Sequence, residues 1–337
     1  MREPNKQIRA VYRWIVVALL AVAAMSPFLA TPPHSRAGSL STGIIGMFPK
    51  EVGEFAYADL KSARKYSWFP KVREQMLPSR FRQFEQFLTS AGIDPDTQVE
   101  ELAWGGMAAD KSGGEDIVGV ALGSFDPAST EARFKQQKMT STEVHGYHLY
   151  AFGSGRSASD ILFFFIDSNT AAFGHRPALE KLIDVRFGGS ESLLTNDAIF
   201  PLIGEANGEG LIWAVLDKSY THLAMQQLLP QVSQIPEAAV RVDRLRAMTI
   251  NIDADSGINA RLQAVCASPD DANLLAAGLQ AGLMYRRYQE SSSNPDLARV
   301  LDGVTVSPAG DRLKITAAVS EDQINALIKS RAFAVPM

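Results

Sequence analysis

Two histidines stand three residues apart in the stretch Glu143-Val-His-Gly-Tyr-His148, in a chain of 337 residues that contains five histidines. On one face of a helix, such a pair beside a glutamate could bind a metal ion or supply a general base. On a strand, the odd spacing sends His145 and His148 to opposite faces, where they cannot bind one ion. Gly146 and its β-branched and aromatic neighbours favour a hairpin with His145-Gly146 as the turn. We therefore predict a piece of sheet, with His148 among aromatic residues, and no metal site.

A dispersed catalytic site is the remaining chemical possibility, because the sequence contains no G-x-S-x-G, H-E-x-x-H, P-loop or CxxC motif. Its candidate general bases are the histidines of the main body, His145, His148, His175 and His222. Cys266 is the only cysteine, so no intramolecular disulfide can form, and its apolar surroundings are typical of a small residue in a strand. These patterns favour a protein that is not an enzyme, with no cofactor.

Three further motifs are better explained by turns and loops than by chemistry. Asp253-Ala-Asp-Ser-Gly257 begins like a calcium loop, but its glycine comes one position early and Ala264 stands where a glutamate is required. Gly153-Ser-Gly-Arg-Ser-Ala158 fits G-x-G-x-x-A, but a strand follows where a dinucleotide site requires a helix. We predict a hairpin turn for the first and a loop for the second. The acidic group of Asp94, Asp96, Glu100 and Glu101 is predicted to be a solvated loop.

The N-terminus has the pattern of an export segment. Basic residues up to Arg13 precede an apolar run that extends from Trp14 towards Ala30, and a Pro-rich stretch follows. Cleavage after Ala37 fits the small-x-small rule through Ser35, but segment 14–30 is also close to the length of a membrane anchor. Both alternatives stay open. Either one places the body outside the cytoplasm, in the periplasm, on the inner membrane or secreted.

The charge of the body argues against nucleic acid as a partner. Residues 1–37 hold five basic residues and one acidic residue, so the remaining 28 basic and 36 acidic residues give a formal charge of −8. Nucleic-acid affinity comes largely from basic residues that neutralise phosphates. An anionic membrane surface is disfavoured on the same ground.

The order of predicted elements occurs twice along the chain. Strands are expected near 54–60, 99–109, 116–124, 140–152, 160–167 and 170–174, with helices over 61–91 (broken by Pro70 and Pro78), 126–138 and 177–185. Downstream, 211–218 resembles 55–61, Ser268-Pro269 resembles Asp126-Pro127, and Thr316-Ala-Ala resembles Thr170-Ala-Ala. The offsets drift between 142 and 158 residues while the order is preserved, which indicates an old duplication.

We therefore predict an α+β fold of tandem duplicated antiparallel units, with helices packed mainly on one face and an apolar helix at the N-terminus. The predicted parts are 1–37 as signal or anchor, 45–190 as the first half, 191–208 as a connecting helix and 209–335 as the second half. Stripes at Phe81, Phe84, Phe87 and Leu88, and at 274–284, are predicted to lie in the core.

Several short stretches resemble those of uncharacterised bacterial envelope proteins, which are exported and often membrane-anchored. The stretches are Phe48-Pro49, Tyr57-Ala-Asp-Leu-Lys61, Gly92-Ile-Asp-Pro95 and Val144-His-Gly-Tyr147. The resemblance implies no catalytic residue. Together with the export segment, it predicts a non-enzymatic envelope protein that binds a protein or small-molecule partner. The alternatives are an exported hydrolase that uses one of the four histidines, and a carrier of an apolar small molecule.

Overall fold

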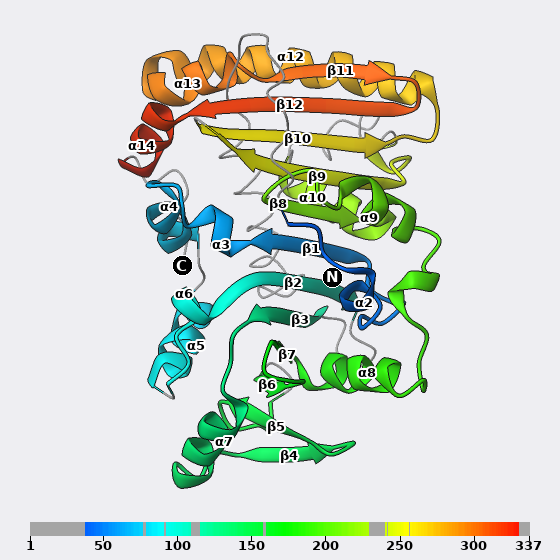
Figure 1. The fold of residues 1–337 in the computed structure, drawn as a ribbon. Coiled ribbons are helices and arrows are strands. Elements are labelled where there is room, and N and C mark those ends of the chain that lie inside the picture. Colours follow the sequence, from blue (N-terminus) through cyan, green and yellow to red (C-terminus); the bar gives the residue numbers. More distant parts are fainter. Residues whose placement is uncertain are drawn as a thin grey trace. The chain divides into compact units, whose positions relative to one another are not determined.

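The computed structural model describes residues 38–76, 79–90, 92–108, 115–157, 160–228, 240, 242–255 and 257–329. The signal or anchor prediction falls on 1–37, outside these residues. No helix in the described ranges is both long and apolar enough to cross a membrane. The described chain forms two compact units (Figure 1): an N-terminal unit of 38–62 and 79–201, and a C-terminal unit of 63–76 and 202–329. Each unit combines helices with antiparallel strands, so the fold class is α+β.

The N-terminal unit is built on an antiparallel sheet with the strand order β1-β2-β3-β7-β6-β5-β4. Its strands are β1 (Glu54–Asp59), β2 (Val99–Ala108), β3 (Glu115–Gly123), β4 (Ser141–Val144), β5 (Tyr147–Phe152), β6 (Ile161–Phe165) and β7 (Thr170–Gly174). Its helices are α2 (Thr42–Ile45), α3 (Leu60–Ala63), α5 (Ser79–Ser90), α6 (Pro95–Gln98), α7 (Pro127–Gln136) and α8 (Arg176–Arg186), and a 3-10 turn, Leu193–Thr195, follows.

Helix starts follow the local sequence signals closely. Asp126 caps α7, where its Oδ1 accepts a hydrogen bond of 3.1 Å from the Ser129 N–H, and Pro127 occupies the first turn. This confirms the predicted start. The connecting helix predicted over 191–208 is shorter, because only α9 (Phe200–Ala206) is α-helical there.

Helices do not keep to one face of the N-terminal sheet, which corrects that part of the prediction at β6. All five residues of β6 are buried. Phe163 packs with Phe84 of α5 and Phe134 of α7, at ring distances of 6.0 and 5.4 Å. Phe164, which points to the opposite face, packs 4.8 Å from Tyr147, on the side of α8. A continuous apolar run covered on both faces explains this burial. The stripe on α5 is core, as predicted, at Phe84.

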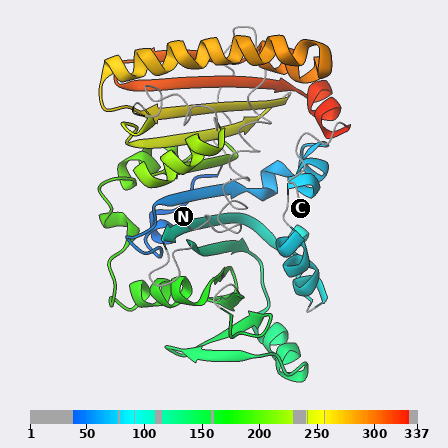
Figure 2. The same cartoon turned by 180° about the vertical axis from the view of Figure 1, so that it is seen from behind.

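The C-terminal unit has the strand order β8-β9-β10-β12-β11, again antiparallel. Its strands are β8 (Ile212–Leu216), β9 (Ala247–Ala254), β10 (Gly257–Val265), β11 (Thr305–Ala309) and β12 (Arg312–Ser320). Its helices are α4 (Phe69–Met76), α10 (Lys218–Leu228), α12 (Pro269–Ser293), α13 (Pro295–Leu301) and α14 (Glu321–Lys329). Helix α12 lies along β11 and β12, as the opposite views of Figures 1 and 2 show.

The two units share one order of strands. The sequence β1-β2-β3-β7-β6 in the first corresponds to β8-β9-β10-β12-β11 in the second, and the hairpin of β4 and β5 is added at the edge of the first. The helix after the first strand also starts in the same way in both units. Asp59 Oδ1 accepts from the Ser62 N–H at 2.7 Å, and Asp217 Oδ1 accepts from the Tyr220 N–H at 2.9 Å.

Candidate functional site

The histidine pair lies in a two-residue hairpin. Residues His145 and Gly146 have φ angles of +48° and +84°, the combination that a type I′ turn requires. Val144 pairs with Tyr147, and Glu143 pairs with His148. The predicted turn is confirmed. The hairpin fixes the register so that His148 lies on the returning strand β5, while His145 stays at the tip.

His145 and His148 have separate surroundings. The His145 ring stacks on Phe187 at 4.8 Å, and its Nε2 lies 3.6 Å from Asp184 Oδ1, with both side chains about half exposed. The His148 ring lies 6.4 Å from that of Tyr150. Within the described ranges, no group of three or more His, Cys, Asp or Glu side chains is arranged to hold a metal ion.

His175 forms the most protected histidine–carboxylate pair. Its Nδ1 lies 3.3 Å from Asp116 Oδ1, and the two side chains are only 17% and 13% exposed. The His175 N–H donates to the Ile117 carbonyl at 2.8 Å, which fixes the residue between β7 and α8. The neighbouring Arg176 donates to Thr142 Oγ1 at 3.1 Å. An aspartate in this position can orient an imidazole and stabilise its protonated form.

His222 belongs to helix α10 of the C-terminal unit. Its Nδ1 lies 3.8 Å from Asp243 Oδ1, while its Nε2 is buried and has no hydrogen-bond partner. Asp217, at the start of the same helix, has its pKa raised by burial, and the nearby His222 opposes this shift when it is protonated. His222 therefore lies close to Asp217, the carboxylate that caps α10.

The structure thus places three candidate histidines beside three different aspartates. For His145, His148 and His222, the described contacts include no Ser or Thr hydroxyl that could serve as a nucleophile. Only His175 has a carboxylate partner that is itself well protected from solvent.

A polar group on β1 and β2 was missed by sequence reasoning. The Tyr57 hydroxyl donates to Glu101 Oε2 at 2.9 Å. Burial, followed by the charge of Glu101, raises the Tyr57 pKa well above its ordinary value. The predicted solvated loop is therefore wrong for Glu100 and Glu101, which lie in strand β2. Asp94 does lie outside the strands, where it caps α6.

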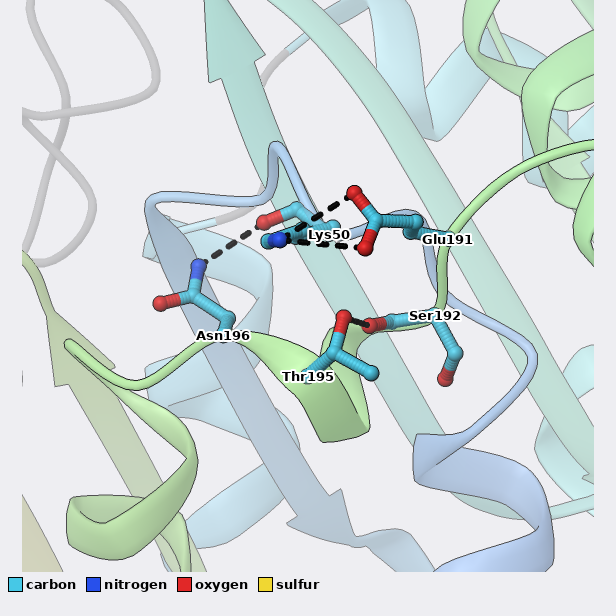
Figure 3. Close-up of polar contacts among 5 residues, drawn as sticks. All are labelled: Lys50, Glu191, Ser192, Thr195 and Asn196. Atoms are coloured by element: carbon cyan, nitrogen blue, oxygen red, sulfur yellow. Dashed lines mark hydrogen bonds and ion pairs between the residues drawn. The ribbon is translucent and has the colours of Figure 1, made fainter.

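A second group of polar contacts that sequence reasoning missed joins 46–52 to 191–196 in the N-terminal unit (Figure 3). Lys50 forms an ion pair of 3.1 Å with Glu191, and Asn196 Nδ2 donates to the Lys50 carbonyl at 2.8 Å. The Ser192 hydroxyl donates to the Gly46 carbonyl at 2.9 Å, and Ser192 forms an isolated bridge with Pro49. These contacts hold 46–52 against 191–196, so their role is structural.

The two loops that resemble binding motifs are explained by their own hydrogen bonds. In the Gly/Ser loop, the buried Asp160 accepts from the Ser154 hydroxyl at 2.9 Å and from the Ser157 N–H at 3.2 Å. Strand β6 follows directly, as predicted. Asp253 lies at the end of β9, where the Asp255 N–H donates to the Gly257 carbonyl and closes the predicted hairpin.

Neither a protein-family model nor a curated protein sequence matches the chain. Among solved structures, one titled "Structure of crystal form I of TP0453" is similar, with a TM-score of 0.47 and 12% sequence identity. The alignment covers 89% of this chain and 99% of that chain. No residue role and no activity are transferred from that protein to this chain.

Proposed function

We propose that the protein is a non-enzymatic, extracytoplasmic envelope protein that binds a protein partner through the exposed face of helix α12. The observation that carries the proposal is an apolar face on a long helix whose opposite face is already packed. The export segment within 1–37 supports a location outside the cytoplasm.

Helix α12 is apolar on both sides. Ala272, Leu275 and Ala276 are buried. On the other side, Leu274, Met284, Tyr285 and Tyr288 are 49%, 66%, 64% and 79% exposed. The predicted core location of 274–284 is wrong for Leu274 and Met284. The exposed set forms the α12 face, which we define as Leu274, Ala277, Gly278, Ala281, Met284, Tyr285 and Tyr288.

The geometry of a helix gathers these residues into one stripe. At about 100° per residue, the seven positions fall within a sector of about 120°. Tyrosine and methionine are enriched at protein interfaces, and a polar rim around an apolar centre is typical of them. The exposed polar residues Asn273 and Gln289 lie at the two edges of the stripe. A monomeric protein rarely exposes such a patch without a binding role.

A protein partner fits this surface better than an anionic membrane does. The body carries a formal charge of −8, which would repel anionic lipid headgroups. Membrane-binding helices combine an apolar face with a basic polar face. We therefore assign the α12 face to a protein, and membrane binding becomes an outcome of the test.

The proposed architecture is a tandem duplication, with halves at 45–190 and 209–335. The shared strand order of the two units and the matching roles of Asp59 and Asp217 support it. In this arrangement the N-terminal half adds β4 and β5, and the C-terminal half extends its second crossing helix into α12, which presents the binding face.

Site-specific crosslinking tests the proposal. A photoreactive side chain at Met284 should crosslink one envelope protein in intact cells, and Tyr288→Asp should abolish the product. The same group at Arg261, which is exposed on β10, is the matched control and should not give it. Equal products at both positions, or crosslinks from Met284 to lipid alone, would rule out a protein-binding α12 face.

Hydrolysis is a second candidate, favoured by the protected pair of His175 and Asp116. A general base oriented by a carboxylate is a frequent arrangement in exported hydrolases. Screening the purified protein against ester, amide and glycoside substrates, with His175→Ala as control, tests it. Any turnover that persists in the variant would exclude His175 as the base.

A further inference from the structure

The first residue that the structure describes, Gly38, lies against an acidic group on β1 and β2. A Cβ atom at Gly38 would lie 2.9 Å from the Tyr57 hydroxyl, 3.6 Å from Asp59 Oδ2 and 3.9 Å from Glu101 Oε1. The first distance is shorter than real Cβ contacts allow. A side chain here would crowd the Tyr57 hydroxyl, so glycine lets the backbone approach this group closely.

The Gly38 nitrogen is close to the same oxygens. Backbone geometry separates a nitrogen from its own Cβ by about 2.5 Å, so the Gly38 nitrogen lies within about 6.5 Å of both carboxylates. Asp59 is only 7% exposed; its Oδ1 accepts a hydrogen bond from the Ser62 N–H, and its Oδ2 faces Gly38. A buried carboxylate oxygen in this position favours a nearby cation.

The charges around this position are unbalanced. Asp59 on β1 and Glu100 and Glu101 on β2 are acidic, and among the described residues Lys61 is a basic residue that interacts with all three. Lys61 forms its hydrogen bond with Glu100 at 2.9 Å. Lys61 thus pairs with Glu100, and Asp59 and Glu101 interact with Lys61 only through its charge.

Hydrolysis at one bond would supply a second cation there. Ser35 and Ala37 satisfy the small-x-small rule for cleavage of the Ala37–Gly38 bond. Water adds across this bond, so Ala37 leaves with a new carboxylate and Gly38 gains an amine. The amine takes up a proton at neutral pH, since an α-amino group has a pKa of about 7.7 to 8.0.

We propose that a leader peptidase cleaves the chain after Ala37, and that the α-ammonium group of Gly38 then binds Asp59 and Glu101 beside the Tyr57 hydroxyl. The mature N-terminus becomes part of the N-terminal unit. This inference rests on the export that the proposed function also requires, but it does not depend on the α12 face.

The cleavage site is tested on the full chain expressed in a bacterial host. Intact mass and N-terminal sequencing of the exported protein should give Gly38 as the first residue. Ala37→Phe should block processing, whereas Ala30→Phe, the matched control at the alternative site, should not. A mature protein that begins elsewhere, or that keeps its leader, would overturn the proposal.

The binding of the α-ammonium group is tested by its acylation rate as a function of pH, followed on the N-terminal peptide by mass spectrometry. In the wild type, the pH at which the acylation rate reaches half its maximum should lie about one unit above the ordinary α-amino pKa. Glu101→Gln and Asp59→Asn should return it towards that value. Glu143→Gln, which removes an exposed carboxylate on the edge strand β4, is the control.

The variants distinguish loss of ammonium binding from misfolding of the protein. Gln and Asn keep an acceptor for the Tyr57 hydroxyl and the Ser62 N–H, and if Asp59→Asn does not fold, Glu101→Gln alone decides. A wild-type acylation midpoint at the ordinary α-amino pKa, or an equal shift in Glu143→Gln, would refute the binding. Crosslinking from Met284 in Glu101→Gln should stay unchanged, so loss of this site leaves the proposed function testable.

Discussion

Replacing Asn196 with alanine should destabilise the N-terminal unit far more than removing the ion pair beside it. The Asn196 Nδ2 donates to the carbonyl oxygens of Lys50 at 2.8 Å and Val52 at 3.3 Å. Its Oδ1 accepts from the N–H groups of Ala198 at 3.0 Å and Ile199 at 3.3 Å. One partly buried side chain thus links the chain before β1 to the start of α9.

The magnitudes follow from the geometry. A hydrogen bond contributes about 0.5 to 1.5 kcal/mol net, and the two long bonds belong at the low end, so Asn196→Ala should cost about 2 to 4 kcal/mol. The Lys50 and Glu191 side chains are 41% and 69% exposed. Exposed ion pairs contribute about 0 to 1 kcal/mol, so Glu191→Gln should cost less than about 1 kcal/mol.

Urea unfolding of the full chain gives the free energies, and hydrogen exchange of peptides covering 46–56 locates the change. Asn196→Asp is the matched variant, since it keeps the acceptor and removes both donors. Exchange in 46–56 should be faster in both Asn196→Asp and Asn196→Ala than in Glu191→Gln. A cost for Glu191→Gln that equals that of Asn196→Ala would refute the reasoning, because charge would then dominate over buried hydrogen bonding.

Three further predictions concern buried groups. Burial raises the pKa of Cys266 to about 11, so a disulfide reagent at pH 8 should react with it only at the rate of unfolding. Because the buried thiol stays protonated to higher pH than it does in the unfolded chain, the free energy of unfolding should fall as pH rises towards 11. Phe134, fully buried among aromatic rings, should cost about 3 to 5 kcal/mol on replacement by alanine in urea unfolding, against less than about 1 kcal/mol for the exposed Phe187. Burial would raise the pKa of Asp160, but hydrogen bonds from Ser154 and three backbone N–H groups outweigh it and lower the pKa. Asp160→Asn should therefore destabilise the protein above about pH 4, and the difference from wild type should vanish as pH falls through the lowered pKa in a denaturation series.

Features set by a few adjacent residues could be predicted from the sequence. The turn at His145-Gly146 and the capped start at Asp126-Pro127 each depend on local backbone preferences, and both are confirmed. The calcium-like stretch after Asp253 is a hairpin for the same reason. A type I′ turn or a helix cap is decided within four residues, so distant parts of the chain cannot easily override it.

Features set by distant residues could not be predicted. Glu101 and Tyr57 are 44 residues apart, and Asn196 and Lys50 are 146 apart. No spacing rule connects such pairs. Hydrophobic periodicity also failed at α12, because both faces of this helix are apolar and the pattern does not tell which one the sheet covers.

Each unit has an aspartate at the end of its first strand that caps the following helix. Asp59 is the last residue of β1 and Asp217 directly follows β8, and each accepts from the backbone N–H three residues on. Burial raises the pKa of Asp217, and a positive charge on His222, in the helix that Asp217 caps, would oppose this effect. Asp59 is buried, whereas Asp217 is only partly buried, and Asp59 has Glu101 as a neighbouring carboxylate. The proposed α-ammonium group of Gly38 would supply a positive charge beside these two carboxylates, which gives the processed N-terminus a structural role in the N-terminal unit.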